Sequence, residues 1–129
     1  MISSSMGIAV SGLMAASKRL DNSANNVANI SSASNASTGR EAFKPQQVTQ
    51  TSLATGGVRS GLQASEPSSF AVYQPDSVQA DAQGIVNYPN VSLEREVVDQ
   101  QLAKYDYKAN LKVIERTDDM MEDLLNITA

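Results

Sequence analysis

A repeat of apolar and small side chains that alternates steps of four and three residues dominates the first thirty positions of this chain. In an α-helix this spacing places all members on one narrow stripe, which is typical of a helix that packs lengthwise against another helix. Burial of one stripe does not offset the entropy lost in ordering the segment, so this helix needs partners on more than one side. The members of this repeat, here called the predicted seam, are Met6, Val10, Leu13, Ser17, Leu20, Ala24 and Val27.

A row of asparagines lies beside the predicted seam, at Asn22, Asn25, Asn26 and Asn29. Asparagine is a mediocre helix former, so this row weakens the helix locally. One interpretation is a helix end that frays into the following loop. The other is control of register, because a partly buried amide that is satisfied in one alignment penalises every other alignment.

Two glycines interrupt the same helical segment, at Gly7 and Gly12. Each costs about 1 kcal/mol relative to alanine inside a helix. We interpret them as sites of close backbone approach to a neighbour, or as a helix start that becomes ordered only when it is packed.

The longest helical pattern runs from about Val91 to Ile127, after a start signal formed by Pro89 with Asn90 or Ser92. Its apolar residues form two adjacent stripes, which implies two packing partners or one wide buried arc. The first stripe contains Val98, Leu102, Tyr105, Ala109, Val113, Met120, Leu124 and Ile127. The second stripe contains Tyr107, Leu111, Ile114, Met121 and Leu125.

The middle of the chain is polar and rich in turn-forming residues, with strand-like content at 47–51 and 70–73. We therefore predict a mainly α fold with a small β element. Long helices at the two ends pair as an antiparallel coiled coil, and a short hairpin or extended region lies between them. The expected division is an N-terminal helix at 1–30, a loop and small β region at 31–90, and a C-terminal helix at 91–129.

The composition argues against several classes of function. The 129 residues include no cysteine and no histidine, and the formal net charge is −4. We expect no catalytic set, no cofactor and no metal site, because activated nucleophiles and the usual zinc ligands are missing. An acidic balance argues against a nucleic-acid partner. The apolar stretch at 6–16 is far shorter than the roughly 20 residues of a bilayer crossing, and no basic residue precedes it, so we expect neither membrane insertion nor a cleaved signal.

The last helical segment carries a cluster of acids at Asp118, Asp119, Glu122 and Asp123. A solvated helix face and a docking surface for a basic neighbour both explain such a cluster. Terminal helices that require partners favour a non-enzymatic structural subunit. The alternative is a small helical-hairpin binding module, such as a secretion chaperone or regulator.

Three stretches carry a resemblance to a known family. Ser11-Gly12-Leu13, Arg19-Leu20 and the run from Asn25 to Asn29 resemble the N-terminal signature of bacterial flagellar axial proteins. Residues 81–91 resemble the junction before the last helix in the proximal-rod members of that family, and 107–110 with 124–127 resemble that helix itself. The chain departs from the junction pattern at Gln83 and Ile85, where an acid and an aromatic residue are usual.

The resemblance implies a subunit of the proximal rod, which crosses the periplasm and transmits torque from motor to hook. It implies export through the flagellar type III apparatus without a cleaved signal, and helices that pack into the inner tube of the rod. The implied partners are other proximal and distal rod proteins, the junction of the MS ring with the export gate, and further copies of the chain.

The residues that we expect at the assembly interface come from both terminal helices. They are Met6, Val10, Leu13, Leu20, Asn22, Asn25, Asn26, Val27, Asn29, Val98, Leu102, Tyr105, Tyr107, Asn110, Leu111, Ile114, Met121 and Leu124.

Overall fold

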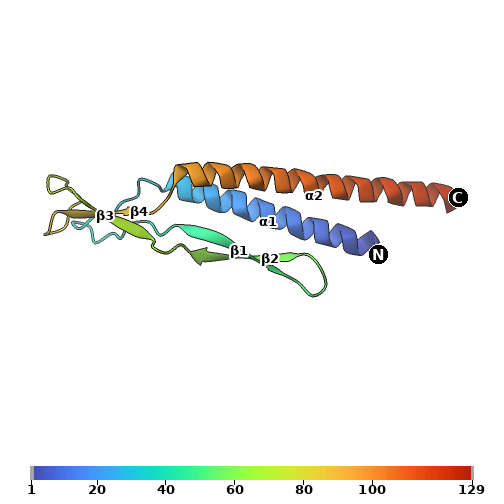
Figure 1. The fold of residues 1–129 in the computed structure, drawn as a ribbon, viewed down its shortest axis with the longest axis horizontal. Helices are drawn as coiled ribbons and strands as arrows, with labels where there is room; N and C mark the ends of the chain where they lie inside the picture. Colours follow the sequence, from blue (N-terminus) through green and yellow to red (C-terminus); the bar gives the residue numbers. More distant parts are fainter. Residues whose placement is uncertain (1, 129) are drawn as a thin grey trace.

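The computed structural model describes residues 2–128, which form an elongated molecule built on two long helices that lie side by side (Figure 1). Helix α1 spans Ile2–Ala28 and helix α2 spans Leu93–Thr128. The helices are antiparallel, so that α1 begins and α2 ends at the same end of the molecule. Four strands lie between them in sequence: β1 Gln46–Ser52, β2 Val58–Ala64, β3 Ser69–Tyr73 and β4 Ile85–Pro89. The mainly helical fold with a small β element is confirmed.

Small side chains line the contact between the two helices. Ala9 and Ala16 of α1 are buried, as are Ala103 and Thr117 of α2. Ser23, also buried, donates a hydrogen bond from its Oγ to the backbone oxygen of Glu96 at 3.0 Å. The spacing of three and four residues is retained along α1, but its members are mostly small: Ala9, Gly12, Ala16, Arg19 and Ser23. Small residues let two helix backbones approach closely, so the intramolecular contact is tight and buries little apolar area.

This small-residue row differs from the predicted seam, which lies about 100° around α1 from it. Along the predicted seam, Leu20 is exposed, while Met6, Val10, Leu13 and Val27 are only half-buried. The larger apolar side chains therefore do not form the contact between α1 and α2. A contact of the predicted seam with another chain stays a prediction.

Strands β1 and β2 form an antiparallel hairpin that packs along α1. Their register runs from Gln46 opposite Ala64 to Ser52 opposite Val58. Gly56 and Gly57 make the turn with φ angles of +88° and +86°, a backbone region that other residues rarely adopt. The sequence predicted a strand at 47–51, which β1 confirms, but it gave no signal for β2.

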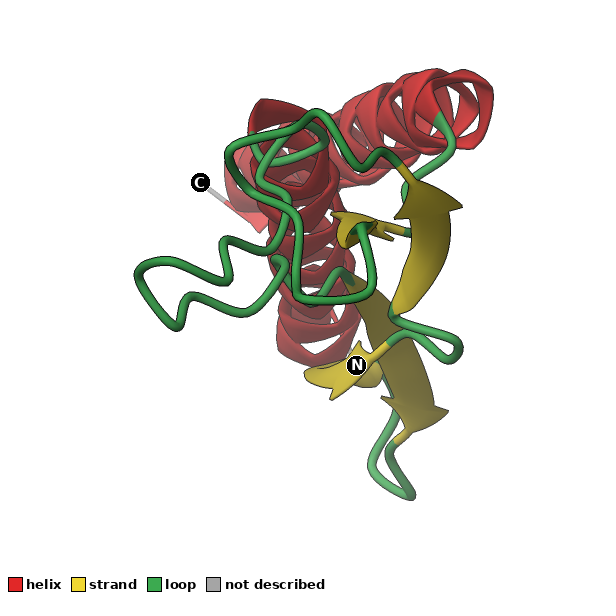
Figure 2. Ribbon diagram, turned by 90° about the vertical axis from the view of Figure 1, so that its left-hand side faces the viewer, coloured by secondary structure: helices red, strands yellow, loops and turns green. Residues whose placement is uncertain are grey.

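Strands β3 and β4 form a second antiparallel hairpin at the far end of the molecule from the helix termini (Figure 1). The Phe70 and Tyr88 rings stack across it with centroids 6.1 Å apart, and Val86 is fully buried. The strand predicted at 70–73 is confirmed by β3. Seen from that end, the strands gather on one side of the helices, which leaves the other side of the helix pair uncovered (Figure 2).

Candidate assembly interface

One of the predicted register asparagines links three separate elements. Asn26, only 3% exposed, donates from Nδ2 to the backbone oxygen of Gln46 at 2.8 Å and accepts the backbone N–H of Gln46 at 3.1 Å. The same Nδ2 donates to Oε1 of Glu96 on α2 at 2.9 Å. The side-chain amide thus pairs with the first residue of β1 as a neighbouring strand would, and it fixes the end of α1 against α2.

Of the other three asparagines, one shares a partner with Asn26 and two bond each other. Asn22 also donates to the backbone oxygen of Gln46, at 2.7 Å. Asn29 donates to Oδ1 of Asn25 at 2.8 Å, one helical turn earlier, at an exposed position. Asn22 and Asn26 therefore bind other elements of the subunit, whereas Asn25 is exposed and Asn29, half-buried, bonds only near the helix end in the described residues.

Two further polar side chains of α1 hold the hairpin, and the sequence analysis missed both roles. Ser11 accepts the backbone N–H of Val58 at 3.1 Å, and its own hydroxyl donates to the backbone oxygen of Ile8 at 2.7 Å. Lys18 donates from Nζ to the backbone oxygen of Ser60 at 3.2 Å. We call Ser11, Lys18, Asn22 and Asn26 the clamp row. Its spacing of seven, four and four residues places it on one helix face, which is the signal that was available in the sequence.

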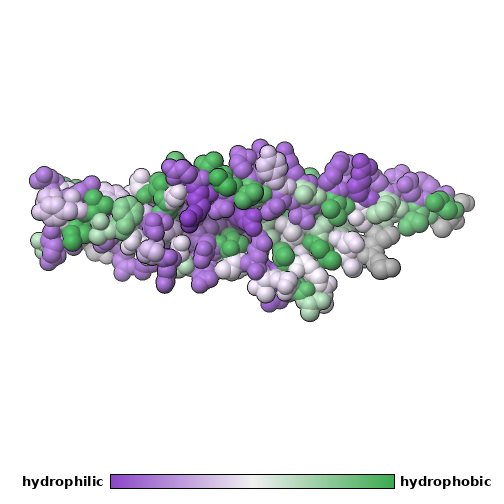
Figure 3. Space-filling view, in the orientation of Figure 1, coloured by the Kyte–Doolittle hydropathy of each residue, from purple (hydrophilic) through white to green (hydrophobic). Residues whose placement is uncertain are grey.

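The first apolar stripe of α2 is exposed along the full length of the helix. Tyr105 is 68% exposed and Ile127 is 80% exposed, and each other member also belongs to the exposed class. Apolar side chains recur on the visible surface of the helices in Figure 3. A row of this length on one side of a soluble helix is far more than the scattered apolar residues of an ordinary surface.

The second stripe of α2 lies nearer to α1. Ile114, Met121 and the predicted residue Asn110 are half-buried, while Tyr107 and Leu111 are exposed. Asn110 donates from Nδ2 to the backbone oxygen of Asp106, and Asp106 forms an ion pair with Arg19 of α1 at 2.9 Å. This stripe therefore borders the intramolecular contact and continues onto the uncovered side of the helix pair.

An apolar groove of about 360 Å³ lies between α1 and α2, and its lining on α1 includes none of the clamp-row residues that bind the hairpin. Leu20 and Tyr107 line it, together with Ala16 and Ala103 from the helix contact. Lys104 and Lys108 also line the groove, and among the described residues that line it there is no carboxylate. The groove is therefore bordered by one residue of the predicted seam, Leu20, and by one residue of the second stripe, Tyr107.

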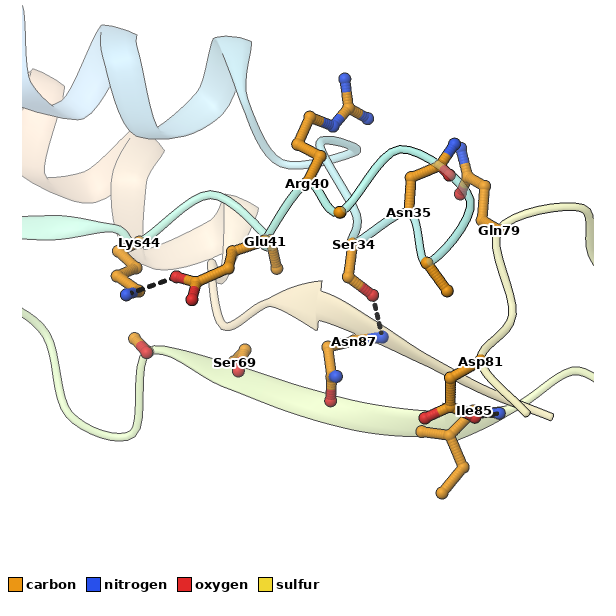
Figure 4. A pocket seen from close by; sticks show the side chains of 14 residues that line it. Ser34, Asn35, Arg40, Glu41, Lys44, Ser69, Gln79, Asp81, Ile85 and Asn87 are labelled. Atoms are coloured by element: carbon orange, nitrogen blue, oxygen red, sulfur yellow. Dashed lines mark hydrogen bonds and ion pairs between the residues drawn. The ribbon is translucent and has the colours of Figure 1, made fainter. Parts of the chain in front are cut away.

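A second hollow, of about 480 Å³, lies between the loop after α1 and the β3–β4 hairpin (Figure 4). Ser34 accepts the backbone N–H of Asn87 there at 2.9 Å, and Lys44 pairs with Glu41 at 2.7 Å. A hydrogen bond and the charge of Lys44 lower the pKa of Glu41, which is fully exposed. These are ordinary surface groups, and they do not form an activated nucleophile or an acid–base pair.

Two further properties concern the part of the chain that the structure describes. Across residues 2–128 there is no group of three or more acidic, histidine or cysteine side chains placed to hold a metal ion. Within the same residues, neither helix combines the length and apolar character of a membrane crossing.

This chain is similar to known proteins over nearly its whole length, and a family model matches the region of its last helix. A family model described as the C-terminal part of the flagellar basal body rod FlgEFG proteins matches residues 82–127. The chain is 35% identical over 126 residues to the flagellar basal-body rod protein FlgC of Yersinia enterocolitica. It is 36% identical over 126 residues to that of Salmonella typhimurium, and 34% identical over 125 residues to that of Escherichia coli O157:H7. Each alignment covers 93% of this chain and 92% of the relative.

Proposed function

The chain belongs to the FlgC family of flagellar basal-body rod proteins, which makes it a structural subunit of the rod, and we propose that it polymerises through its terminal helices. The exposed first stripe of α2 carries this proposal. Because the stripe lies away from α1 and remains in water in the isolated subunit, its burial by neighbouring subunits supplies a hydrophobic driving force for assembly.

The proposed interface combines this stripe with the predicted seam of α1. The contact between α1 and α2 is made largely of small residues, so the larger apolar side chains of both helices stay available to other chains. We propose that neighbouring copies and adjacent proximal and distal rod proteins cover them, with the MS ring and export-gate junction at the base. In this arrangement the helices build the inner tube that transmits torque, and the hairpins lie outside it.

We also propose that the protein has no catalytic activity and leaves the cytoplasm through the type III apparatus. The resemblance to proximal-rod proteins supports the export route, and the hollow between the loop after α1 and the β3–β4 hairpin offers no reactive set. The alternative of a small helical-hairpin binding module has no observation in its favour.

The proposed alignment role of the asparagines concerns mainly Asn25 and Asn29, because their side chains bond each other and Ser32 rather than β1 or α2. Replacing Asn26 and Asn29 by alanine in cells tests the role predicted for the whole row. We expect fewer assembled rods and weaker motility, and unimpaired assembly would remove that role. Adding Asn29→Ala alone separates alignment between subunits from the internal link that Asn26 makes.

Substitutions on the first stripe test the proposed function directly. In the triple variant Leu102→Gln, Val113→Gln and Met120→Gln, we expect the protein to be depleted from purified basal bodies and motility to fall. The isolated variant should keep its helical circular dichroism, because all three side chains are exposed. The control is Val78→Gln in the loop between β3 and β4, at a residue 87% exposed. Normal incorporation of the triple variant would contradict the proposal.

A further inference from the structure

We propose that the acidic end of α2 in one subunit docks into the lysine-flanked groove between α1 and α2 of a second copy. This proposal rests on the proposed function, because it names which surfaces meet when the helices assemble. It gives one occupant to the groove and one partner to the acidic cluster.

The groove offers an apolar floor with positive edges. Leu20 and Tyr107 on its floor are 43% and 44% exposed, so each has apolar area left to bury. Lys104 and Lys108 lie one helical turn apart along one wall, and no lining residue carries a negative charge. On α1 the groove is lined by Ala16, Ser17 and Leu20, whereas the β1–β2 hairpin is bound by the clamp row, so the hairpin and a docked helix would use different residues of α1.

The end of α2 has the complementary character. With 36 residues against the 27 of α1, α2 continues past the start of α1 as a single helix (Figure 1). No lysine or arginine follows Arg116, whereas four acids do. Arg116 pairs with Asp119 at 3.1 Å, but Asp118, Glu122 and Asp123 form no ion pair within the described residues. Leu125, 70% exposed, lies beside Glu122 on the helix surface, and Ile127, 80% exposed, lies beside Asp123.

The two surfaces cannot meet within one chain. Lys108 and Glu122 lie on the same straight helix, and fourteen residues separate them by about 21 Å. The second partner must therefore come from another molecule, and a copy of the same chain carries the required acidic helix end. Opposite charges across the contact would select this pairing and fix its register, while the apolar side chains supply the burial.

Charge reversal with rescue tests the pairing. Lys104→Glu with Lys108→Glu reverses the groove, and Asp118→Lys with Glu122→Lys reverses the helix end. Each double variant should reduce incorporation into basal bodies about tenfold, the loss expected for two partly exposed ion pairs replaced by repulsion. The variant with all four changes should recover incorporation, because the charges on the end of α2 and in the groove are again opposite. Failure of the fourfold variant to exceed both double variants would overturn the proposal.

A cross-linking experiment identifies the occupant. The chain has no cysteine, so Leu20→Cys in one tagged copy and Glu122→Cys in a differently tagged copy are its only thiols. Oxidation of basal bodies that hold both copies should join the two tags, whereas Val78→Cys with Glu122→Cys should not. Basal bodies that contain both copies without the link overturn the docking and leave the proposed function intact. A link from Leu20→Cys to a different protein also overturns it. Absence of the parent chain from basal bodies would contradict the proposed function instead.

Discussion

Gly12 of α1 lies directly against Asn110 of α2, so closely that a Cβ on Gly12 would be 2.5 Å from the Asn110 Oδ1. Asn110 is half-buried and held by its hydrogen bond to the backbone oxygen of Asp106. The glycine therefore has a packing reason that outweighs its poor helix propensity. The prediction of close backbone approach is confirmed at this position, whereas a Cβ on Gly7 would meet nothing within 4 Å.

We predict that Gly12→Ala destabilises the subunit by roughly 1–3 kcal/mol, the range for overpacking a tight contact. Gly7→Ala should instead stabilise it by up to about 1 kcal/mol, because alanine is the better helix former and the space is open. Chemical denaturation of both variants measures the difference. Adding Asn110→Ala to Gly12→Ala should recover most of the loss, and equal effects of the two glycine substitutions would contradict the prediction.

Removal of the Asn26 side chain should cost more than removal of any other asparagine in the row. Asn26→Ala leaves the backbone N–H of Gln46 and one Glu96 oxygen, both in part-buried hydrogen bonds, without their partner, so we expect a loss of about 1–3 kcal/mol. Asn25→Ala, at an exposed position on the same helix, should lose less than about 0.5 kcal/mol. Thermal unfolding followed by circular dichroism compares them. A loss at Asn26 no larger than that at Asn25 would show that water replaces the bonds.

Helix content and helix pairing could be predicted from the sequence because both depend on local periodicity. The face that α1 turns toward α2 could not, because the large side chains of Leu13 and Leu20 give a stronger periodic signal than the alanines beside them. Each helix of an assembling subunit has to pack within its own chain and also against neighbouring chains. Here the small residues Ala9 and Ala16 pack within the chain, and the larger apolar side chains remain on the surface.

Strand β2 was missed for a related reason. Its sequence around Gly61 has little of the β-branched content that marks a strand, so local propensity is weak. The strand forms because the turn at Gly56 and Gly57 folds the chain back, and because Ser11 and Lys18 bind its backbone from α1. Such contacts between residues 40 or more positions apart leave no periodic trace in the sequence.

The clamp row predicts a specific change in local mobility. In Ser11→Ala the backbone N–H of Val58 loses its acceptor, and we expect faster hydrogen exchange at Val58 without a change in the centre of α2. Ser17→Ala, on the uncovered side of the same helix, is the matched control and should leave exchange at Val58 unchanged. Exchange of the isolated protein, measured by nuclear magnetic resonance, resolves this single amide. Unaltered protection of Val58 in Ser11→Ala would mean that the Ser11 hydroxyl does not hold this end of the hairpin.

The start of α2 predicts a pH dependence with a defined sign. Ser92 precedes the helix, accepts the backbone N–H of Arg95 at 3.4 Å and donates to Oε2 of Glu94 at 3.0 Å. The backbone N–H of Glu94 and the Ser92 hydroxyl lower the pKa of the Glu94 carboxyl, since both favour its charged form. A carboxyl whose pKa is lowered in the folded state stabilises that state above its unfolded pKa, and this contribution disappears as the pH falls through the folded pKa.

We therefore expect the first turn of α2 to fray on acidification, and the midpoint of the Glu94 side-chain titration to lie below the ordinary value for glutamate. In Ser92→Ala the midpoint should rise toward that value, because one of the two donors to the carboxylate is gone, while the bond from the backbone N–H of Glu94 prevents a complete return. Titration followed by nuclear magnetic resonance measures both midpoints. An identical midpoint in the parent and in Ser92→Ala would show that the hydroxyl does not hold the carboxylate in solution, and the helix start would then depend on the remaining backbone contacts alone.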